Sequence, residues 1–413
     1  MNRPGVTLGS VLLLLLPVSA GAQKYYTYAG QIGTNSALVA WGTAHSAGNT
    51  IGRTSASHGK AMLKIGPKTV QTERNWALVN GLEPDTEYSY AVTIDGRAAG
   101  EGSIRTDPER SNQLAFFVIG DFGTGSARQY KIAARMLTEF EKRRRSGNPV
   151  RFVLTTGDNI YADFNIGNIS LRSGDQDRDW EKKFFQPYEW LIRDVPFYTT
   201  LGNHDGNTNE NRGDLAAYLD NFFFPQAQPA RWYAFSFGGL ADFFALDSTD
   251  NTESGPPRPD YGPDSQQFQW LKQALKQSHA PWKIPYYHHP AFNAGPRHPA
   301  YLDTLRHFLE LFEGSGVKVV FNGHEHNFQY SKQNRATGGM CFVISGAGGE
   351  LRPGNVTRNM DAANIAGWAG QNHFLVVEIV DRTMRITPVS FEPVVVRDSR
   401  GKPIQLPIVV QLP

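Results

Sequence analysis

Short runs of alternating apolar and polar residues, separated by frequent turn signals, fill the chain from Tyr25 to about Asp107. No segment of this region has the 3.6-residue apolar period that a helix requires. Closely spaced short strands without helices are typical of an all-β sandwich. We therefore predict a sandwich whose strands include 37–41, 61–65, 76–79 and 88–92.

The pattern changes at Leu114, where apolar strands begin to alternate with helical stretches. In 127–145, for example, apolar residues recur at close to a helical period. Strand–helix alternation predicts an α/β layered core, and the Gly-, Asn- and Pro-rich segments at 206–231 and 248–263 predict long surface loops. Further helices are expected at 180–192, 267–279 and 301–312, and further strands at 374–380, 384–389, 393–396 and 408–410.

The first 22 residues have the features of an export signal. Arg3 gives a positively charged start, an apolar run follows, and 20–22 fits a small-residue cleavage site. The alternative is a membrane anchor, but a spanning helix needs about 20 apolar residues and Pro17 ends the run early. We therefore expect a secreted or periplasmic protein with no membrane span. Asn168 and Asn355 begin formal glycosylation sequons, whose use depends on the source organism.

Composition narrows the classes of function. The chain has 41 Lys+Arg against 39 Asp+Glu, a formal charge of +2 with no long basic run, which argues against nucleic acid as the main partner. A single cysteine, Cys341, excludes a disulfide framework and a cysteine-based zinc cluster within one chain. Of eleven histidines, six lie between 288 and 326. That cluster is where candidate chemistry concentrates.

Five predicted strands end in short polar motifs. Ligands in open α/β sheets bind beyond the carboxyl ends of the strands, so we expect these motifs to form one site. Carboxylate, amide and imidazole groups suit Fe, Mn or Zn. His324 and His326 are two residues apart, so an extended backbone would direct both to one metal, or to two metals about 3.5–4 Å apart. The candidate ligands at the strand ends are Asp121, Asp158, Asn203, His288, His324 and His326.

Each of these residues also has a structural interpretation. Asp121 and Asn203 are common turn residues, and His204 fits an exposed loop. His289 is adjacent to a better-placed ligand and His307 lies in a helical pattern, so we interpret both as structural. A succession of five strand-end motifs is nevertheless explained far better by a metal site than by coincidence.

The chain resembles the purple acid phosphatases of the metallophosphoesterase superfamily over about 113–392. The resemblance rests on five motifs in family order: GDFG at 120–123, GDNIY at 157–161, GNHD at 202–205, HHP at 288–290 and GHEH at 323–326. It implies an α/β fold in which a layered metallophosphoesterase-type β-sandwich is flanked by helices.

The N-terminal region resembles a fibronectin type III-like domain. The segment 81–90, GLEPDTEYSY, matches the pattern of a tyrosine corner. The expected organisation is a signal peptide at 1–22, a small all-β fibronectin III-like sandwich at 23–108, a catalytic domain at 113–392 and a C-terminal extension at 393–413.

The resemblance to purple acid phosphatases also implies a dinuclear centre of Fe(III) and a divalent Fe, Zn or Mn ion. This chain has Gly123 where the wider superfamily has a histidine, and Tyr161 where purple members use a tyrosinate. The implied ligands of the ferric ion are Asp121, Asp158, Tyr161 and His326. The implied ligands of the divalent ion are Asp158, Asn203, His288 and His324, with Asp158 bridging. His204 and His298 are implied as catalytic, one of them protonating the leaving group.

The expected function is an exported acid phosphatase, in which a metal-activated hydroxide attacks a phosphate monoester in line with the leaving group. A phosphodiesterase or nucleotidase is an alternative, because the ligands alone do not separate monoesters from diesters. A remote alternative is a non-catalytic adhesion or binding protein that works through its β-sandwich. The sequence leaves the natural substrate, the pH optimum and the oligomeric state open.

Overall fold

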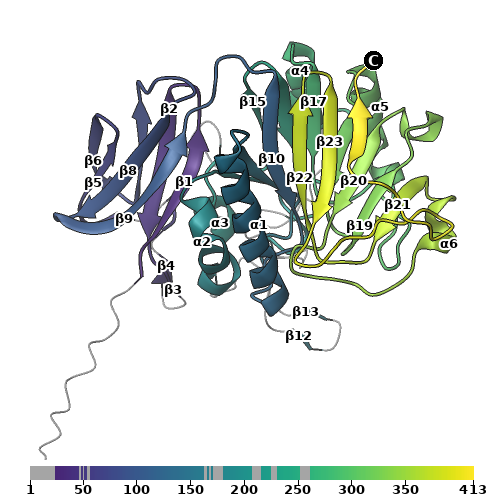
Figure 1. Cartoon of the computed structure of the whole chain (residues 1–413), viewed down its shortest axis with the longest axis horizontal. Helices are drawn as coiled ribbons and strands as arrows, with labels where there is room; N and C mark the ends of the chain where they lie inside the picture. Colours follow the sequence, from purple (N-terminus) through teal and green to yellow (C-terminus); the bar gives the residue numbers. More distant parts are fainter. Residues whose placement is uncertain are drawn as a thin grey trace, which may run out of the picture.

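The computed structural model describes residues 24–45, 48–49, 51–53, 56–161, 165–166, 169–170, 180–206, 215–224, 230–251 and 261–413. The predicted signal peptide and the sequon at Asn168 lie outside these residues. Figure 1 shows the N-terminal strands at one end of the molecule and two larger sheets with their helices at the other. Within the described ranges, no helix is long and apolar enough to cross a bilayer.

The N-terminal strands form an all-β sandwich, as the alternating pattern predicts. One sheet has the order β1-β2-β7 and the other has the order β6-β5-β8-β9. The tyrosine corner predicted at 81–90 is confirmed, because the backbone N–H of Glu83 donates to the hydroxyl of Tyr88 across 2.9 Å. The strands, with a short hairpin of β3 and β4, are β1 (Tyr26–Ile32), β2 (Ser36–Gly42), β3 (Ala44–His45), β4 (Gly48–Asn49), β5 (Ala56–Ile65), β6 (Lys68–Arg74), β7 (Trp76–Asn80), β8 (Glu87–Ile94) and β9 (Arg97–Arg105).

Two larger sheets form the rest of the core, and the predicted α/β class is confirmed. Their strand orders are β14-β11-β10-β22-β23-β24 and β15-β16-β17-β18-β20-β19-β21. Aromatic side chains fill the space between them, and the ring centroids of Phe116 and Phe243 lie 5.4 Å apart. The strands are β10 (Gln113–Ile119), β11 (Val150–Thr155), β14 (Phe197–Thr199), β15 (Tyr233–Phe237), β16 (Ala241–Ala245), β17 (Trp282–Tyr286), β18 (Val319–Asn322), β19 (Phe328–Ser331), β20 (Cys341–Ser345), β21 (Ile365–Ala369), β22 (Phe374–Val380), β23 (Thr383–Val389) and β24 (Ile408–Gln411).

Helices cover the outer faces of both sheets. Apolar residues of α1, Ile132, Met136 and Phe140, are buried in the core that includes the six-stranded sheet, and α4 and α5 pack on the seven-stranded sheet. All four predicted helices are present, although the one at 180–192 begins with a π-helical turn, η2. The remaining elements are α1 (Ala127–Arg145), β12 (Asn165–Ile166), β13 (Ile169–Ser170), η2 (Glu181–Phe185), α2 (Gln186–Ile192), α3 (Ala216–Asn221), α4 (Gln266–Gln277), α5 (Leu302–Gly314), η3 (Arg335–Thr337) and α6 (Thr357–Met360).

The N-terminal sandwich packs directly on the layered core. The ring of Tyr28 on β1 makes edge contacts with Phe184 and Phe223, at centroid distances of 6.1 and 5.6 Å. Farther along the same junction, the Tyr90 hydroxyl donates to the carbonyl of Arg193 across 2.8 Å. Tyr28 is fully buried and belongs to the same hydrophobic cluster as the two large sheets. The sandwich and the layered core therefore share apolar packing.

The strand predicted at 393–396 is wrong, because these residues form no ladder. Pro393 has no N–H to give to a sheet. The N–H of Val395 donates instead to the side chain of Gln371 across 2.9 Å. The carbonyl of Val396 accepts from the N–H of Ile404, inside an irregular turn. Beyond this segment, β24 pairs antiparallel with β23 and ends the six-stranded sheet.

The predicted surface loops at 206–231 and 248–263 are only partly correct where the structure describes them. The first contains α3 and the buried residues Phe222, Phe223 and Phe224. In the second, Thr249 and Asn251 are buried, and the Asn251 side chain donates to the carbonyl of Gly202 across 2.9 Å. Composition alone does not separate such packed segments from exposed ones.

Candidate metal centre

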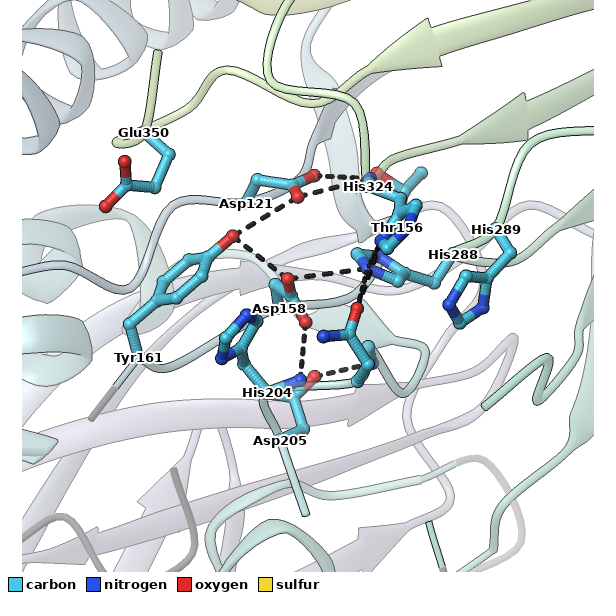
Figure 2. Close-up of polar contacts among 12 residues, drawn as sticks. Asp121, Thr156, Asp158, Tyr161, His204, Asp205, His288, His289, His324 and Glu350 are labelled. Atoms are coloured by element: carbon cyan, nitrogen blue, oxygen red, sulfur yellow. Dashed lines mark hydrogen bonds and ion pairs between the residues drawn. The ribbon is translucent and has the colours of Figure 1, made fainter. Parts of the chain in front are cut away.

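The five strand-end motifs come together at one edge of the two large sheets. Strands β10, β11 and β14 run parallel in one sheet, and β17 and β18 run parallel in the other. Polar side chains beyond these ends point toward one another in Figure 2. The site therefore lies where the carboxyl ends of both sheets meet, as expected for this class of fold.

Tight turns place the ligating atoms. Asp121, Asp158 and His324 have positive φ values of 55°, 50° and 70°, which are strained for residues other than glycine and typical of functional sites. Gly202 allows two motifs to touch, because a Cβ there would lie 2.0 Å from the backbone nitrogen of Asp158. The predicted use of glycine for close approach is confirmed at this position.

Four oxygen and nitrogen atoms form a first cluster around the Tyr161 hydroxyl. This oxygen lies 2.9 Å from Oδ2 of Asp158 and 3.2 Å from Oδ1 of Asp121. Nε2 of His326 lies 3.2 Å from the same hydroxyl and 3.3 Å from Oδ1 of Asp121. The other three predicted ligands of the first metal therefore lie within hydrogen-bond distance of the Tyr161 hydroxyl.

A second cluster surrounds the side-chain oxygen of Asn203. Oδ1 of this residue lies 3.0 Å from Nε2 of His288 and 3.0 Å from Nδ1 of His324. The two imidazole nitrogens are 3.1 Å apart. Oδ2 of Asp158 completes the group, 3.4 Å from Nε2 of His288. Asp158 thus contributes to both clusters, as expected of a bridging residue.

Hydrogen bonds outside the second cluster fix which imidazole nitrogens face inward. Nδ1 of His288 donates to the carbonyl of Thr156 across 2.8 Å, so Nε2 is left for the site. Nε2 of His324 lies 3.1 Å from the hydroxyl of Tyr301, which leaves Nδ1 for the site. Groups in such positions orient metal-ligating histidines in known centres.

The donor set of both clusters fits a metal ion. Atoms that bind one ion at 2.0–2.2 Å lie about 3 Å from each other, which is the spacing found in both clusters. Three atoms that can accept hydrogen bonds converge in the second cluster, with few N–H groups among them to donate. They are Oδ1 of Asn203, Nε2 of His288 and Nδ1 of His324. Burial lowers the pKa of His288, but the carboxylate of Asp158 outweighs it and raises that pKa to about 9. A cation between these atoms would replace the proton that His288 then holds.

The first cluster shows the same need for positive charge. Burial raises the pKa of Tyr161 well above its usual range, and the carboxyls of Asp121 and Asp158 raise it further. Burial also raises the pKa of Asp121. Two carboxyls and a phenol this close do not all ionise unless a cation lies among them. The ligand atoms of Asp121, Asp158 and His326 also lie within 4.8 Å of one another, which is close enough to hold one ion.

The two predicted catalytic histidines both border the clusters. The backbone N–H of His204 donates to Oδ1 of Asp158 across 2.8 Å, and its ring lies 4.6 Å from the ring of Tyr161. His298 is half-buried, with its ring 4.0 Å from the ring of His324. Burial lowers the pKa of His298 to about 4, and the nearby charge of Arg352 acts in the same direction.

Two further histidines were interpreted as structural, and they differ in position. His307 is exposed on α5, with Nδ1 3.6 Å from Glu310. His289 is buried beside the second cluster, where its ring lies 4.4 Å from that of His324 and Nδ1 lies 3.0 Å from the Ser248 hydroxyl. Its side-chain nitrogens lie close enough to His288 and His324 to share an ion with them.

Several supporting residues are not evident from the sequence. Asp205 accepts from the backbone N–H groups of Gly202 and Asn159, at 2.7 and 2.8 Å, and so ties two motifs together. Thr156 acts through its carbonyl, and Tyr301 lies at the start of a predicted helix with no motif around it. Of these three residues, only Asp205 has a signal in the sequence, because it is the last residue of the GNHD motif at 202–205.

Comparisons with known proteins agree with this geometry. Residues 114–328 match the model of the calcineurin-like phosphoesterase family. The chain is 26% identical over 294 residues to purple acid phosphatase 3 of Arabidopsis thaliana, which covers 66% of this chain and 73% of the relative. It is 26% identical over 262 residues to human tartrate-resistant acid phosphatase type 5, covering 58% of this chain and 74% of the relative.

The fold also resembles that of a solved purple acid phosphatase, PPD1 from yellow lupin seeds. The match has a TM-score of 0.64 and 16% sequence identity, and it covers 94% of this chain and 74% of the lupin chain. Coverage of this extent includes the N-terminal sandwich as well as the layered core. Because the matched family model spans just over half of the sequence, the chain belongs to the calcineurin-like phosphoesterase family.

Proposed function

We propose that this protein is an exported acid phosphatase of the purple type, which hydrolyses phosphate monoesters at a dinuclear metal centre. The observation that carries the proposal is the pair of clusters that share Asp158, each with donor atoms about 3 Å apart. Similarity to proteins named purple acid phosphatases supports the same function.

Each cluster suits a different ion. The first combines two carboxylates, a phenol and one imidazole, which are hard donors that favour Fe(III). The second replaces the phenol and one carboxylate with an amide oxygen and a second imidazole, which suits divalent Fe, Zn or Mn. The assigned ligands are Asp121, Asp158, Tyr161 and His326 for the first ion, and Asp158, Asn203, His288 and His324 for the second.

One contact must change when the first ion binds. Nε of Arg352 donates to Nδ1 of His326 across 3.1 Å, which leaves the proton of a neutral imidazole on Nε2. A metal on Nε2 requires that proton on Nδ1. Oε2 of Glu350 lies 3.9 Å from Nδ1 and would accept a hydrogen bond from the N–H formed there. We therefore expect the side chain of Arg352 to move aside in the metal-bound protein.

When bound, the two ions would polarise the phosphate and make water nucleophilic near neutral pH. The chain's own residues supply the rest. His298 and His204 border the clusters, with the ring of His298 over that of His324 and the ring of His204 against that of Tyr161. A leaving oxygen beside either ring would receive a proton from it. The histidine that donates it lowers the charge on the leaving alkoxide as the P–O bond breaks.

Hydrolysis of a chromogenic aryl phosphate by purified protein, before and after chelation, tests the proposal. We expect activity that chelation removes and that Fe(III) with a divalent ion restores. Rates on a bis-aryl phosphate, measured in parallel, separate a monoesterase from a phosphodiesterase. Absence of metal-dependent hydrolysis of either ester would contradict a phosphoesterase function. Secretion is tested separately, by whether the chain produced with residues 1–22 loses them and leaves the cytoplasm.

A further inference from the structure

A fully buried carboxylate lies between two of the assigned ligands. Glu325 follows His324 and precedes His326, and its side chain is fully buried. Oε2 accepts from the backbone N–H of His298 at 2.8 Å and of Arg297 at 3.3 Å. Among the described residues, Glu325 forms no salt bridge, and its Oε1 is buried without a hydrogen-bond partner. Burial of a carboxylate is unfavourable unless hydrogen bonds compensate, so the two loop amides are its principal compensation.

A second buried side chain, next to that of Glu325, binds the same loop. Nδ2 of Asn293 donates to the carbonyl of His298 across 2.8 Å and to Oε2 of Glu325 across 3.3 Å. Oδ1 of Asn293 accepts from the N–H of Gly295 at 2.9 Å. The amide of Gln329 on β19 then donates to that same oxygen at 2.9 Å. The loop is therefore fastened to the strands beneath it by a continuous polar network.

The network ends at one residue. His298 has its N–H bound by Glu325 and its carbonyl bound by Asn293, although its neighbours Arg297 and Pro299 are exposed. A backbone held at both polar groups fixes the direction in which the Cα–Cβ bond leaves the loop. The ring accordingly lies over His324 at a centroid distance of 4.0 Å.

We propose that Glu325, together with Asn293, is a positioning residue that holds His298 over the metal centre so that it can protonate the leaving group. This inference rests on the proposed phosphatase function. It assigns a role to the residue between the two histidines of the GHEH motif, where a carboxylate binds backbone amides of a distant loop. Glu325 itself faces the loop amides, and the two neighbouring histidines would hold the ions.

The first test does not depend on enzymatic activity. Hydrogen–deuterium exchange is compared among the wild-type protein, Glu325→Ala and Glu325→Gln, with metal content measured for each. We expect faster exchange in the peptide covering 293–301 for Glu325→Ala, and near wild-type exchange for Glu325→Gln, whose amide oxygen still accepts both N–H groups. Glu139→Ala is the matched control, because Glu139 is also buried but pairs with Arg143 on α1. Unchanged exchange at 293–301 in Glu325→Ala would overturn the proposal.

The second test separates positioning from a general structural role. Rates are measured on 4-nitrophenyl phosphate, whose leaving group needs little protonation, and on an alkyl phosphate, whose leaving group needs much. We expect kcat on the alkyl ester to fall about tenfold or more in Glu325→Ala and in His298→Ala, with a much smaller change on the nitrophenyl ester. The double variant should be no slower than His298→Ala alone, since both changes remove one function.

The outcomes distinguish the two proposals. Equal losses on both esters, or multiplying losses in the double variant, would overturn the positioning role while leaving the phosphatase function intact. A wild-type protein without metal-dependent hydrolysis would instead refute the proposed function, and the exchange experiment would still decide whether Glu325 holds the loop. If Glu325→Ala does not fold, Asn293→Ala removes the bond to the His298 carbonyl and is held to the same expectations.

Discussion

Nδ1 of His324 and Nε2 of His288 face each other across 3.1 Å, with the other nitrogen of each ring already engaged. Two imidazole nitrogens in this position either share a proton or bind a cation. The pair therefore makes metal affinity a property of the fold, since the strands that carry the rings fix their separation. It also makes ion binding dependent on pH.

His288→Ala should lower the metal content from two ions per chain to one. The variant removes one nitrogen of the second cluster and leaves the first cluster complete. Elemental analysis of the purified variant measures the stoichiometry, and the thermal midpoint should rise less on adding the divalent ion than in the wild type. Binding at 100 times Kd stabilises a protein by about 2.7 kcal/mol. His307→Ala, a change on the exposed face of α5, should retain both ions.

Tyr161→Phe should abolish the visible colour of the iron-loaded protein. The phenol oxygen lies 2.9 Å from Oδ2 of the bridging Asp158. Visible charge-transfer absorption from phenolate to iron requires this oxygen to be bound to Fe(III). An absorption spectrum records the loss, and circular dichroism checks that the fold is unchanged. Tyr188→Phe is the control, because Tyr188 also loses only a hydroxyl but packs against Phe184 and Phe197 in the apolar core, away from the clusters. Colour retained in Tyr161→Phe would remove tyrosinate from the centre.

Gly202→Ala should separate the second and third motifs and prevent binding of both ions. The added methyl group would lie 2.0 Å from the nitrogen of Asp158 and 2.2 Å from its Oδ1. Overpacking of this kind costs about 1–3 kcal/mol in a well-packed interior, and the strain here falls on the bridging ligand. Urea denaturation and metal analysis measure the two effects. Gly314→Ala, where an added Cβ meets nothing within 4 Å, should change neither by a comparable amount.

His373 should make the protein less stable on mild acidification, independently of the metal centre. This histidine is fully buried, and burial lowers its pKa to about 4. The unfolded chain therefore takes up a proton near pH 6.5 that the folded protein refuses until about pH 4. Stability is full above the unfolded pKa and is lost as the pH falls through this window, by an amount on the order of 3 kcal/mol.

His373→Gln removes that titration and should flatten the dependence of stability on pH between 6.5 and 4. Free energies of unfolding from urea titrations at several pH values, with chelator present throughout, give the difference between the two proteins. Parallel curves for wild type and variant would show that His373 does not contribute.

The sequence predicts the candidate ligands better than it predicts the residues that hold those ligands in place. Asp121, Asp158 and His324 could be found because each follows an apolar strand, and strand ends converge in this class of fold. The partners of those residues act through backbone groups or come from remote positions. Thr156 binds through a carbonyl that any residue carries, and the contact of Tyr301 with His324 depends on how α5 begins.

The fold predictions fail where local composition and tertiary packing disagree. Phe222 and its neighbours lie in a Gly- and Asn-rich segment whose composition predicts exposure. They are buried instead, and the ring of Phe222 packs against Phe184 of η2. The 393–396 segment has the apolar residues of a strand, but its hydrogen bonds go to Gln371 and to a turn. In both cases a distant part of the chain decides the outcome, and no window of sequence contains that information.

Through Tyr28, the N-terminal sandwich forms part of the hydrophobic core of the molecule and is more than an attached module. Its ring completes an aromatic group with Phe184 and Phe223, so one face of β1 is interior to the layered core. The two regions should therefore melt together, in a single calorimetric transition. A chain shortened to begin at residue 113 would present the rings of Phe184 and Phe223 to water, and we expect it to aggregate.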